Sequence, residues 1–462
     1  MTGEDDRATL EEYTVVLFYR YAHIADPQEF VMFLESLCSN SKGTLLGRIL
    51  VAEEGLNGTL AAFEREHLET LIHDIATKYP QFSKVDWKYS IGQGTVLPFS
   101  DLHIRCAKKL LGSGLKGRCV DEMISFSEHS YGGLSEKCTG RHLSPKDFHE
   151  SLMVDSQNEK TPIIIDVRNK FEYAIGHFQS ARSLDTNTYS ESFDALQKLL
   201  LDDLKADKKV PIYMYCTGGI RCEKASVFVK SKGFENVYQL TGGIHRYLED
   251  IRAEDSLFQG KNFVFDSRIS LFQHDNGVNP SCRHPIHEKD EIESHCVHVD
   301  NNTKIVGRCI ECEVPHDSFS GLVVCTVCRV PVLVCSTCVE KLVEFHCESH
   351  QQLKHIYFSM LNRFSVDELV VQRNVLRQME IDLLSSKRGA KNRRRTLRRQ
   401  VAKIEEAIAK ARNGSDLCQN ASQSRDESSS YEDNDSDRKK NVSLLSRNPK
   451  TLMNKAGFFW TS

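Results

Sequence analysis

The chain has 462 residues, of which 40% are hydrophobic and 27% charged, with a formal net charge of −4. These values are ordinary for a globular protein and leave room for about three domains plus tails. No apolar run approaches the roughly 20 residues that span a bilayer, and the acidic residues 1–6 do not resemble a signal peptide. The composition therefore excludes a membrane-spanning protein and predicts a cytoplasmic one.

The first folded region is expected over residues 13–107, after a flexible N-terminus of residues 1–12. Strand and helix patterns follow here in the order strand, helix, strand, strand, helix, strand. We expect two short strands within residues 43–62 to flank Asn57-Gly58, because Asn-Gly is a strong hairpin turn. The order predicts a ferredoxin-like (acylphosphatase-like) domain. Residues 108–142 are rich in Gly, Ser and Lys and are expected to form a linker.

A second region, residues 143–258, alternates strands near 162–167, 210–215 and 237–240 with helices. This alternation predicts an α/β domain with a mostly parallel sheet, whose chemistry gathers at the carboxyl ends of the strands. Cys216 follows one of these strands directly, and Asp166 and Arg168 lie at the end of another. The Asp166 and Arg168 side chains could support a reaction or simply pair with each other and cap the next helix.

The most informative stretch is the loop that follows Cys216 and closes on Arg221, just before an expected amphipathic helix over residues 223–232. Its backbone N–H groups, the helix N-terminus and the Arg221 guanidinium would all favour a thiolate over a thiol. Cys216 and Arg221 are therefore candidate catalytic residues. Cys222 is either a resolving thiol or a buried helix residue. The remaining residues of the active-site loop are Thr217, Gly218, Gly219 and Ile220.

Nine of the sixteen cysteines fall between residues 282 and 347, within an expected metal-binding region over residues 259–358. Cys-x2-Cys turns present two thiolates to one metal, so the pattern predicts two tetrahedral zinc ions with a structural role. Both a sequential and an interleaved pairing of the turns fit the spacing. We find no motif for an organic cofactor. The expected ligands are Cys309, Cys312, Cys325, Cys328, Cys335, Cys338, Cys347 and His350.

Residues 359–412 form an expected basic helical segment, and residues 413–462 an expected disordered tail. Leu397, Val401, Ile404 and Ile408 recur at helical spacing, while residues 363–412 carry 14 Lys or Arg against 6 Asp or Glu. Such a basic segment can contact phosphates, act as a nuclear address around residues 387–399, or form a solvated helix face.

The second region resembles rhodanese domains in Asp166-Val167-Arg168, in Glu172 and Gly176-His177-Phe178, in the cysteine loop and in Gly242-Gly243-Ile244. That resemblance implies a cysteine persulfide held by backbone N–H donors. Related cysteine phosphatases have five residues between the cysteine and the arginine, whereas this chain has four between Cys216 and Arg221. The shorter loop favours sulfur over phosphate chemistry.

Four segments together resemble the bacterial tRNA uridine hydroxylase family: residues 52–59, 166–169, 216–225 and 260–266. The resemblance extends over roughly residues 13–350 and implies oxygen-dependent formation of 5-hydroxyuridine at the tRNA wobble position. It also implies that the loop cysteine is required. Leu184 and Ser190-Glu191-Ser192 depart from the family pattern, in which a proline and a phenylalanine-arginine step stand at these places.

Two alternative functions remain open at this point. One is a sulfurtransferase that takes sulfur from thiosulfate or a persulfide to Cys216 and passes it to a protein or a small thiol. The other is a non-catalytic, zinc-organised binding module. The sequence thus predicts a multidomain α/β protein with no membrane partner, and the resemblances imply tRNA and a sulfur donor, such as thiosulfate or a persulfide, as candidate partners.

Overall fold

The computed structural model describes residues 10–40, 45–112, 123–155, 162–274, 277–280, 305–320, 323–325, 328, 330–341, 345–353, 361, 365–385 and 390–419. It divides into two compact units, residues 1–307 and residues 308–462. Most of the expected flexible N-terminus (1–9) and most of the expected disordered tail (420–462) lie outside the described residues. No helix in the described part of the chain is long and apolar enough to cross a membrane.

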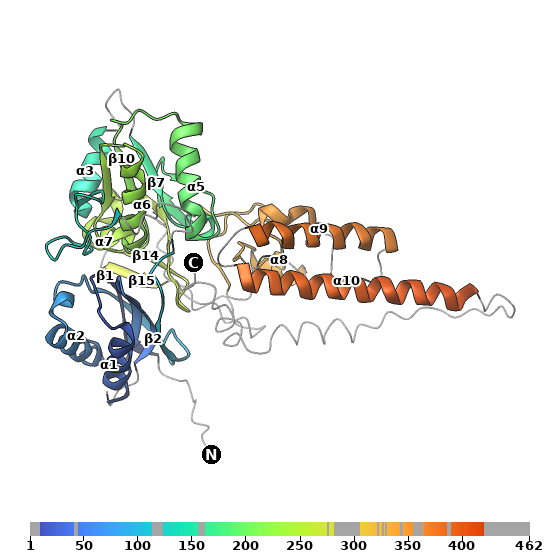
Figure 1. Cartoon of the computed structure of the whole chain (residues 1–462), viewed down its shortest axis with the longest axis horizontal. Coiled ribbons are helices and arrows are strands. Elements are labelled where there is room, and N and C mark those ends of the chain that lie inside the picture. The colour runs from blue at the N-terminus through green and yellow to red at the C-terminus, as the bar shows by residue number, and fades with distance from the viewer. Residues whose placement is uncertain are drawn as a thin grey trace, which may run out of the picture. The chain divides into compact units, whose positions relative to one another are not determined.

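The first unit begins with a five-stranded sheet in the order β4-β1-β3-β2-β5. The strands β4, β1, β3 and β2 are antiparallel to one another, as expected of a ferredoxin-like sheet, and β5 adds at the edge parallel to β2. The helices α1 and α2 lie side by side against this sheet (Figure 1). The elements are β1 (Glu11–Tyr21), α1 (Pro27–Asn40), β2 (Leu46–Ala52), β3 (Gly55–Ala62), α2 (Arg65–Lys78), β4 (Lys88–Gly94) and β5 (Leu102–Cys106).

The expected hairpin turn at Asn57-Gly58 was wrong. The turn between β2 and β3 lies at Glu53 and Glu54, because Ala52 pairs with Gly55 across the hairpin. Asn57 and Gly58 lie inside β3, which pairs with β1 on one side and β2 on the other. A Cβ at Gly58 would come within 2.5 Å of Cζ of Phe18, so this glycine makes room for a core ring instead of forming a turn.

The second sheet of this unit is parallel throughout, with the order β6-β11-β10-β7-β9. Separate clusters of buried apolar side chains cover its two faces, one contributed by α5 and α6 and the other by α3 and α7. This confirms the expected α/β fold. The elements are β6 (Arg141–Leu143), α3 (Pro145–Asp155), β7 (Ile163–Asp166), β9 (Arg182–Ser183), α5 (Ser192–Gln197), β10 (Ile212–Tyr215), α6 (Ile220–Ser231), β11 (Val237–Leu240) and α7 (Gly243–Asp250).

Shorter elements complete the first unit. The helix α4 (Lys170–Ile175) leads into β8 (Gly176–Phe178), which pairs with β12 (Phe258–Gly260). A small antiparallel sheet follows, made of β13 (Asn262–Phe263), β14 (Ser270–His274) and β15 (Gly277–Pro280).

The helix after the cysteine loop is not amphipathic, contrary to the sequence prediction. Every residue of α6 from Arg221 to Val229 is buried, including Glu223 and Lys224. Its apolar side chains pack in the core of the parallel sheet, while Lys224 and Glu223 bind residues of the N-terminal domain. A helix covered on several sides has no solvent face, so its polar side chains need buried partners.

The second unit contains α8 (Ser336–Lys341), α9 (Val366–Ser385) and α10 (Ala390–Gln419). The long helices α9 and α10 run side by side (Figure 1). The helical spacing predicted from the sequence is confirmed, because Leu397, Val401, Ile404 and Ile408 are all buried in the core of this unit.

Candidate active site

Cys216 lies at the carboxyl end of β10, where the chain turns into α6. Its side chain is fully buried, and its Sγ accepts a hydrogen bond from the backbone N–H of Gly219 at 3.1 Å. The loop is also held from α7, since the N–H of Ile244 donates to the carbonyl of Cys216 at 3.0 Å. Gly219 has a φ of +105°, a left-handed conformation that glycine adopts without strain. The loop thus aims a backbone donor at the sulfur.

The surroundings of Cys216 favour the thiolate. Burial alone would raise the pKa of this thiol, but three kinds of interaction outweigh it. A hydrogen bond with the Cys222 side chain, the positive charge of Arg221 and the backbone N–H groups of Arg221 and Cys222 together lower the pKa to about 6. A thiol with this pKa is mostly ionised at neutral pH and is therefore a nucleophile.

Cys222 is fully buried in the first turn of α6. Burial, and then its hydrogen bond with Cys216, raise the pKa of Cys222 well above its usual value. Cys222 is therefore a protonated thiol that donates to the Cys216 thiolate. This hydrogen bond stabilises the thiolate form of Cys216. Cys222 itself, being protonated, has little nucleophilic character.

Arg221 acts on the thiolate through its charge, while its N–H donors bind elsewhere. Its Nη1 and Nη2 donate to the two carboxylate oxygens of Glu172 at 2.6 and 2.8 Å, and Nη2 also donates to Oγ1 of Thr217 at 3.0 Å. Thr217 Oγ1 donates in turn to Glu172 at 3.2 Å. All three side chains are buried. Glu172, to which the sequence assigned no role of its own, thus fixes both ends of the loop.

Asp166 and Arg168 form a buried ion pair at the carboxyl end of β7. Nη2 of Arg168 lies 2.7 Å from Oδ2 of Asp166 and also donates to the carbonyl of Gly176. Both side chains are fully buried. The pairing expected in the simpler of the two sequence interpretations is present, but the expected capping is not, because the N-cap of α4 is Asn169, whose backbone N–H donates to Glu172.

The segment 260–266 also reaches this site. The ring of Phe265 lies 5.8 Å from Cζ of Arg221, and Phe263 packs edge-on against Phe171 of α4. Phe265 thus places an aromatic ring beside the Arg221 guanidinium.

The N-terminal domain contributes a buried ion pair to the helix that follows the loop. Nζ of Lys224 lies 2.9 Å from both carboxylate oxygens of Glu54, and the N–H of Leu110 donates to the same carboxylate. Lys224 is fully buried and Glu54 is 5% exposed. Two of the segments that resemble the hydroxylase family, 52–59 and 216–225, are therefore joined by one salt bridge. Sequence reasoning missed this contact, although both residues stood in the quoted segments.

The second unit contains two groups of potential metal ligands. Within each group the ligand atoms lie within 4.8 Å of one another. The Sγ atoms of Cys312 and Cys335 are 3.6 Å apart and those of Cys328 and Cys347 are 3.7 Å apart, close to the roughly 3.8 Å edge of a zinc–thiolate tetrahedron. The groups are Cys309, Cys312, Cys335 and Cys338, and Cys325, Cys328, Cys347 and His350.

These groupings decide between the pairings that the spacing left open. The turn 325–328 lies in the sequence between the turns 309–312 and 335–338, yet it belongs to the other group, so the two sites are interleaved. Both groups can hold a metal ion.

Comparison with known protein families assigns three parts of the chain. Residues 13–110 match the UPF0176 acylphosphatase like domain, residues 149–250 the rhodanese-like domain and residues 259–351 the rhodanase C-terminal domain. The tRNA uridine(34) hydroxylase of Brucella anthropi is 34% identical over 286 residues, which cover 61% of this chain and 83% of that protein. The chain belongs to the tRNA uridine(34) hydroxylase family.

Two further relatives are similar to this chain, and one solved structure resembles part of it. The tRNA uridine(34) hydroxylase of Bartonella henselae is 35% identical over 62% of this chain and 86% of its own length. Rhodanese-like domain-containing protein 6 of Arabidopsis thaliana is 34% identical over 73% of this chain, but the match spans only about half of that protein, 52%. A solved rhodanese-like domain from Anabaena sp. covers 34% of this chain at 20% identity with a TM-score of 0.22. Membership of this family confirms that the chain is a rhodanese-like enzyme.

Proposed function

We propose that this protein modifies the wobble uridine of tRNA, forming 5-hydroxyuridine in an oxygen-dependent reaction that requires Cys216. The observation that carries this proposal is the buried Cys216, whose Sγ accepts a hydrogen bond from the Gly219 N–H, in a chain whose relatives at about 34% identity are named tRNA uridine(34) hydroxylases. The other three segments that resemble the family contact the strand before the cysteine loop, the end of the loop or the helix after it, through Asp166, Phe265 and Glu54. A tRNA substrate also fits the cytoplasmic location expected from the sequence.

The loop is suited to carry sulfur on Cys216. The thiolate attacks the outer sulfur of thiosulfate, a new S–S bond forms, the S–S bond of thiosulfate breaks, and sulfite leaves with the electron pair. The product is the Cys216 persulfide anion, so charge and atoms balance without an added proton. Backbone N–H groups such as that of Gly219 can hold this anion.

The basic segment supplies a surface that suits an RNA backbone. Arg395, Arg399 and Lys403 are exposed and follow one another at intervals of four residues on α10, and no ion pair is described for them among residues 365–385 and 390–411. By contrast, Arg377 and Arg398 pair with Glu405 and Glu380 across the two helices. Like charges at this spacing repel in the free protein and are relieved by a polyanion, so we assign this stripe to phosphate contacts.

We assign zinc to both ligand groups in the second unit. Four thiolates in one group, and three thiolates with an imidazole in the other, are donor sets that prefer zinc in closed structural sites. When bound, zinc would fix the fold of a segment with a small apolar core. No step of the reaction is assigned to it.

The proposal is tested by mass spectrometry of tRNA nucleosides from cells that lack the protein. We expect wobble 5-hydroxyuridine and its derivatives to disappear, to return with the wild-type gene, and to stay absent with Cys216→Ser. Cys106→Ser serves as the matched control, because Cys106 is a half-buried cysteine of β5 outside the loop. Unchanged 5-hydroxyuridine in the deletion cells would contradict the proposal.

A sulfurtransferase acting on a protein or small thiol is the second candidate, favoured by the four-residue spacing between Cys216 and Arg221. It predicts that thiosulfate adds one sulfur atom to the wild-type chain and none to Cys216→Ser, as read from intact mass. Persulfide formation with unchanged tRNA nucleosides would select this function. The third candidate, a non-catalytic binding module, predicts instead that Cys216→Ser keeps full cellular function while Cys309→Ser loses it.

A further inference from the structure

The strand β1 of the N-terminal domain covers the loop of Cys216 directly. A Cβ added to Gly218 would lie 2.9 Å from Cδ2 of Leu17, and a Cβ added to Gly219 would lie 2.8 Å from Oη of Tyr19. Ile220 packs in the same apolar cluster as Tyr19. The two loop glycines are therefore needed partly because another domain occupies the space that side chains would fill.

The Tyr19 hydroxyl makes a specific contact in this interface. It donates a hydrogen bond of 3.0 Å to Oε1 of Glu223, and both side chains are buried. Burial, and then the negative charge of Glu223, raise the pKa of Tyr19 well above its usual value. Tyr19 is therefore a protonated donor throughout the range in which Cys216 ionises.

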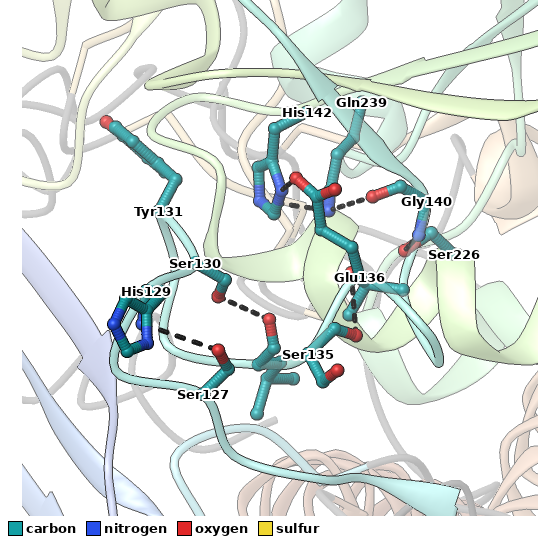
Figure 2. Close-up of polar contacts among 12 residues, drawn as sticks. Ser127, His129, Ser130, Tyr131, Ser135, Glu136, Gly140, His142, Ser226 and Gln239 are labelled. Atoms are coloured by element: carbon teal, nitrogen blue, oxygen red, sulfur yellow. Dashed lines mark hydrogen bonds and ion pairs between the residues drawn. The ribbon is translucent and has the colours of Figure 1, made fainter.

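Glu223 is held on its other sides by the rhodanese domain. His142 of β6 places Nε2 at 2.9 Å from Oε1, and Nε2 of Gln239 of β11 lies 3.3 Å from Oε2. Figure 2 shows how His142 and Gln239 are fixed beside each other, with Gln239 donating to the carbonyl of Gly140 at 3.0 Å. Tyr19 is the only donor to Glu223 from outside this domain among the hydrogen bonds of the described residues.

Glu223 occupies the turn of α6 whose backbone acts on Cys216. It follows Arg221 and Cys222, whose N–H groups lower the pKa of the Cys216 thiol. A buried carboxylate that lost one of its donors would be under-satisfied and would pull this turn toward its remaining partners. The distance from the backbone N–H groups of Arg221 and Cys222 to the Cys216 sulfur therefore depends on where Glu223 is held.

We propose that Tyr19, by binding Glu223 and contacting Gly219, is a positioning residue for the reactive sulfur of Cys216, so that the N-terminal domain is part of the active site. This inference rests on Cys216 as the reactive thiol of the proposed function, and it assigns to the N-terminal domain a role that its sequence did not reveal. Tyr19 acts by holding the N–H donors in place.

The charged and titratable groups around Cys216 come from five elements. A test of Tyr19 therefore has to compare variants that leave all the other groups unchanged. They are Tyr19 of β1, Lys88 of β4, Glu172 of α4, Arg221, Cys222 and Glu223 of α6, and His245 of α7.

The test is an ultraviolet titration of the Cys216 thiolate in the full chain. The absorbance of each variant minus that of the same variant carrying Cys216→Ser reports this thiolate alone, from about pH 4.5 to about pH 8.5. Zinc-bound thiolates cancel in the difference, and neither tRNA nor a sulfur donor is needed. The titration midpoint of Cys216 can therefore be interpreted even if the protein does not modify tRNA. Conversely, an unchanged midpoint in Tyr19→Phe would not contradict the tRNA reaction.

We expect Tyr19→Phe to move the midpoint upward by about one pH unit, which lowers the thiolate fraction at pH 6 about fivefold and changes it little at pH 8.5. The ring is kept, so packing against Gly219 is preserved. Tyr13→Phe on the same strand is the control, since its ring packs against Phe63, and it is expected to titrate like the wild type.

A double variant tests the route through Glu223. If Tyr19 acts through this carboxylate, adding Tyr19→Phe to Glu223→Gln shifts the midpoint less than Tyr19→Phe does alone. Two results would overturn the proposal: a Tyr19→Phe midpoint equal to that of the wild type, or shifts that add fully in the double variant.

Discussion

Glu172 is the residue on which the geometry of the cysteine loop most directly depends. It accepts two hydrogen bonds from Arg221 and one from Thr217, and it is fully buried. A buried carboxylate with so many donors stabilises the fold mainly by keeping its cation paired. The Arg221 charge is then held at a fixed place beside Cys216.

We expect Glu172→Gln to destabilise the protein by about 3 kcal/mol, because the buried Arg221 guanidinium would lose its counter-charge. Urea unfolding followed by fluorescence measures the change. Glu69→Gln, which removes the partner of Arg65 in an exposed ion pair on α2, is the control and is expected to leave the midpoint nearly unchanged. Equal midpoints for Glu172→Gln and the wild type would contradict this role.

At the scale of elements, α6 is the junction between the N-terminal sheet and the parallel sheet. It carries the Cys216 loop at its start, binds Glu172 through Arg221, and reaches Glu54 through Lys224. A second link joins the same regions, since Nη2 of Arg246 on α7 lies 2.5 Å from Oδ1 of Asp86. The domains that contain the two five-stranded sheets are thus connected by charged pairs.

The buried Glu54–Lys224 ion pair is expected to contribute to the stability of this junction. Lys224→Met alone and Glu54→Leu alone are each expected to destabilise the chain by about 3 kcal/mol, because each leaves a buried charge without its main partner. The double variant is expected to recover at least half of the summed loss, since no unpaired charge remains. Chemical unfolding of the wild type, the two single variants and the double variant gives the interaction free energy between Glu54 and Lys224. Strictly additive losses of stability would contradict this interaction.

The sequence predicted the local elements better than the contacts between them. Alternating strands and helices identified both sheets, and the loop after Cys216 was placed correctly because its glycines and arginine are neighbours in the chain. The turn at Asn57-Gly58 was wrong because tertiary packing against Phe18 overrides the local preference of this dipeptide. The Tyr19–Glu223 bond joins residues 204 positions apart, and periodicity carries no information on such a pairing.

At the scale of the whole molecule, the second unit depends on two interleaved ligand groups. Cys309, Cys325 and Cys347 lie in one buried cluster together with residues of α9 and α10. Because the chain passes from one group to the other and back, neither can be removed as a separate segment. Loss of one metal ion should therefore loosen the other.

We expect the purified chain to contain two zinc ions and Cys325→Ser to contain fewer than one, because the interleaved groups share their connecting segments. Inductively coupled plasma mass spectrometry measures the content, and a chromogenic chelator follows the rate of release. Cys38→Ser, a change at a buried cysteine of α1, is the control and should keep both ions. A stable content of one ion in Cys325→Ser would show that the groups are independent.

The burial of Cys216 has a consequence for the chemistry of the cell around it. A thiolate at neutral pH is the form that peroxides oxidise to sulfenic and then to irreversible sulfinic acids. Here the sulfur is fully buried, and Leu17 and Tyr19 of the N-terminal domain lie against Gly218 and Gly219 of its loop, so a peroxide and a substrate meet the same cover. Oxidation of Cys216 and its reaction with a sulfur donor therefore both depend on the contact between β1 and the loop.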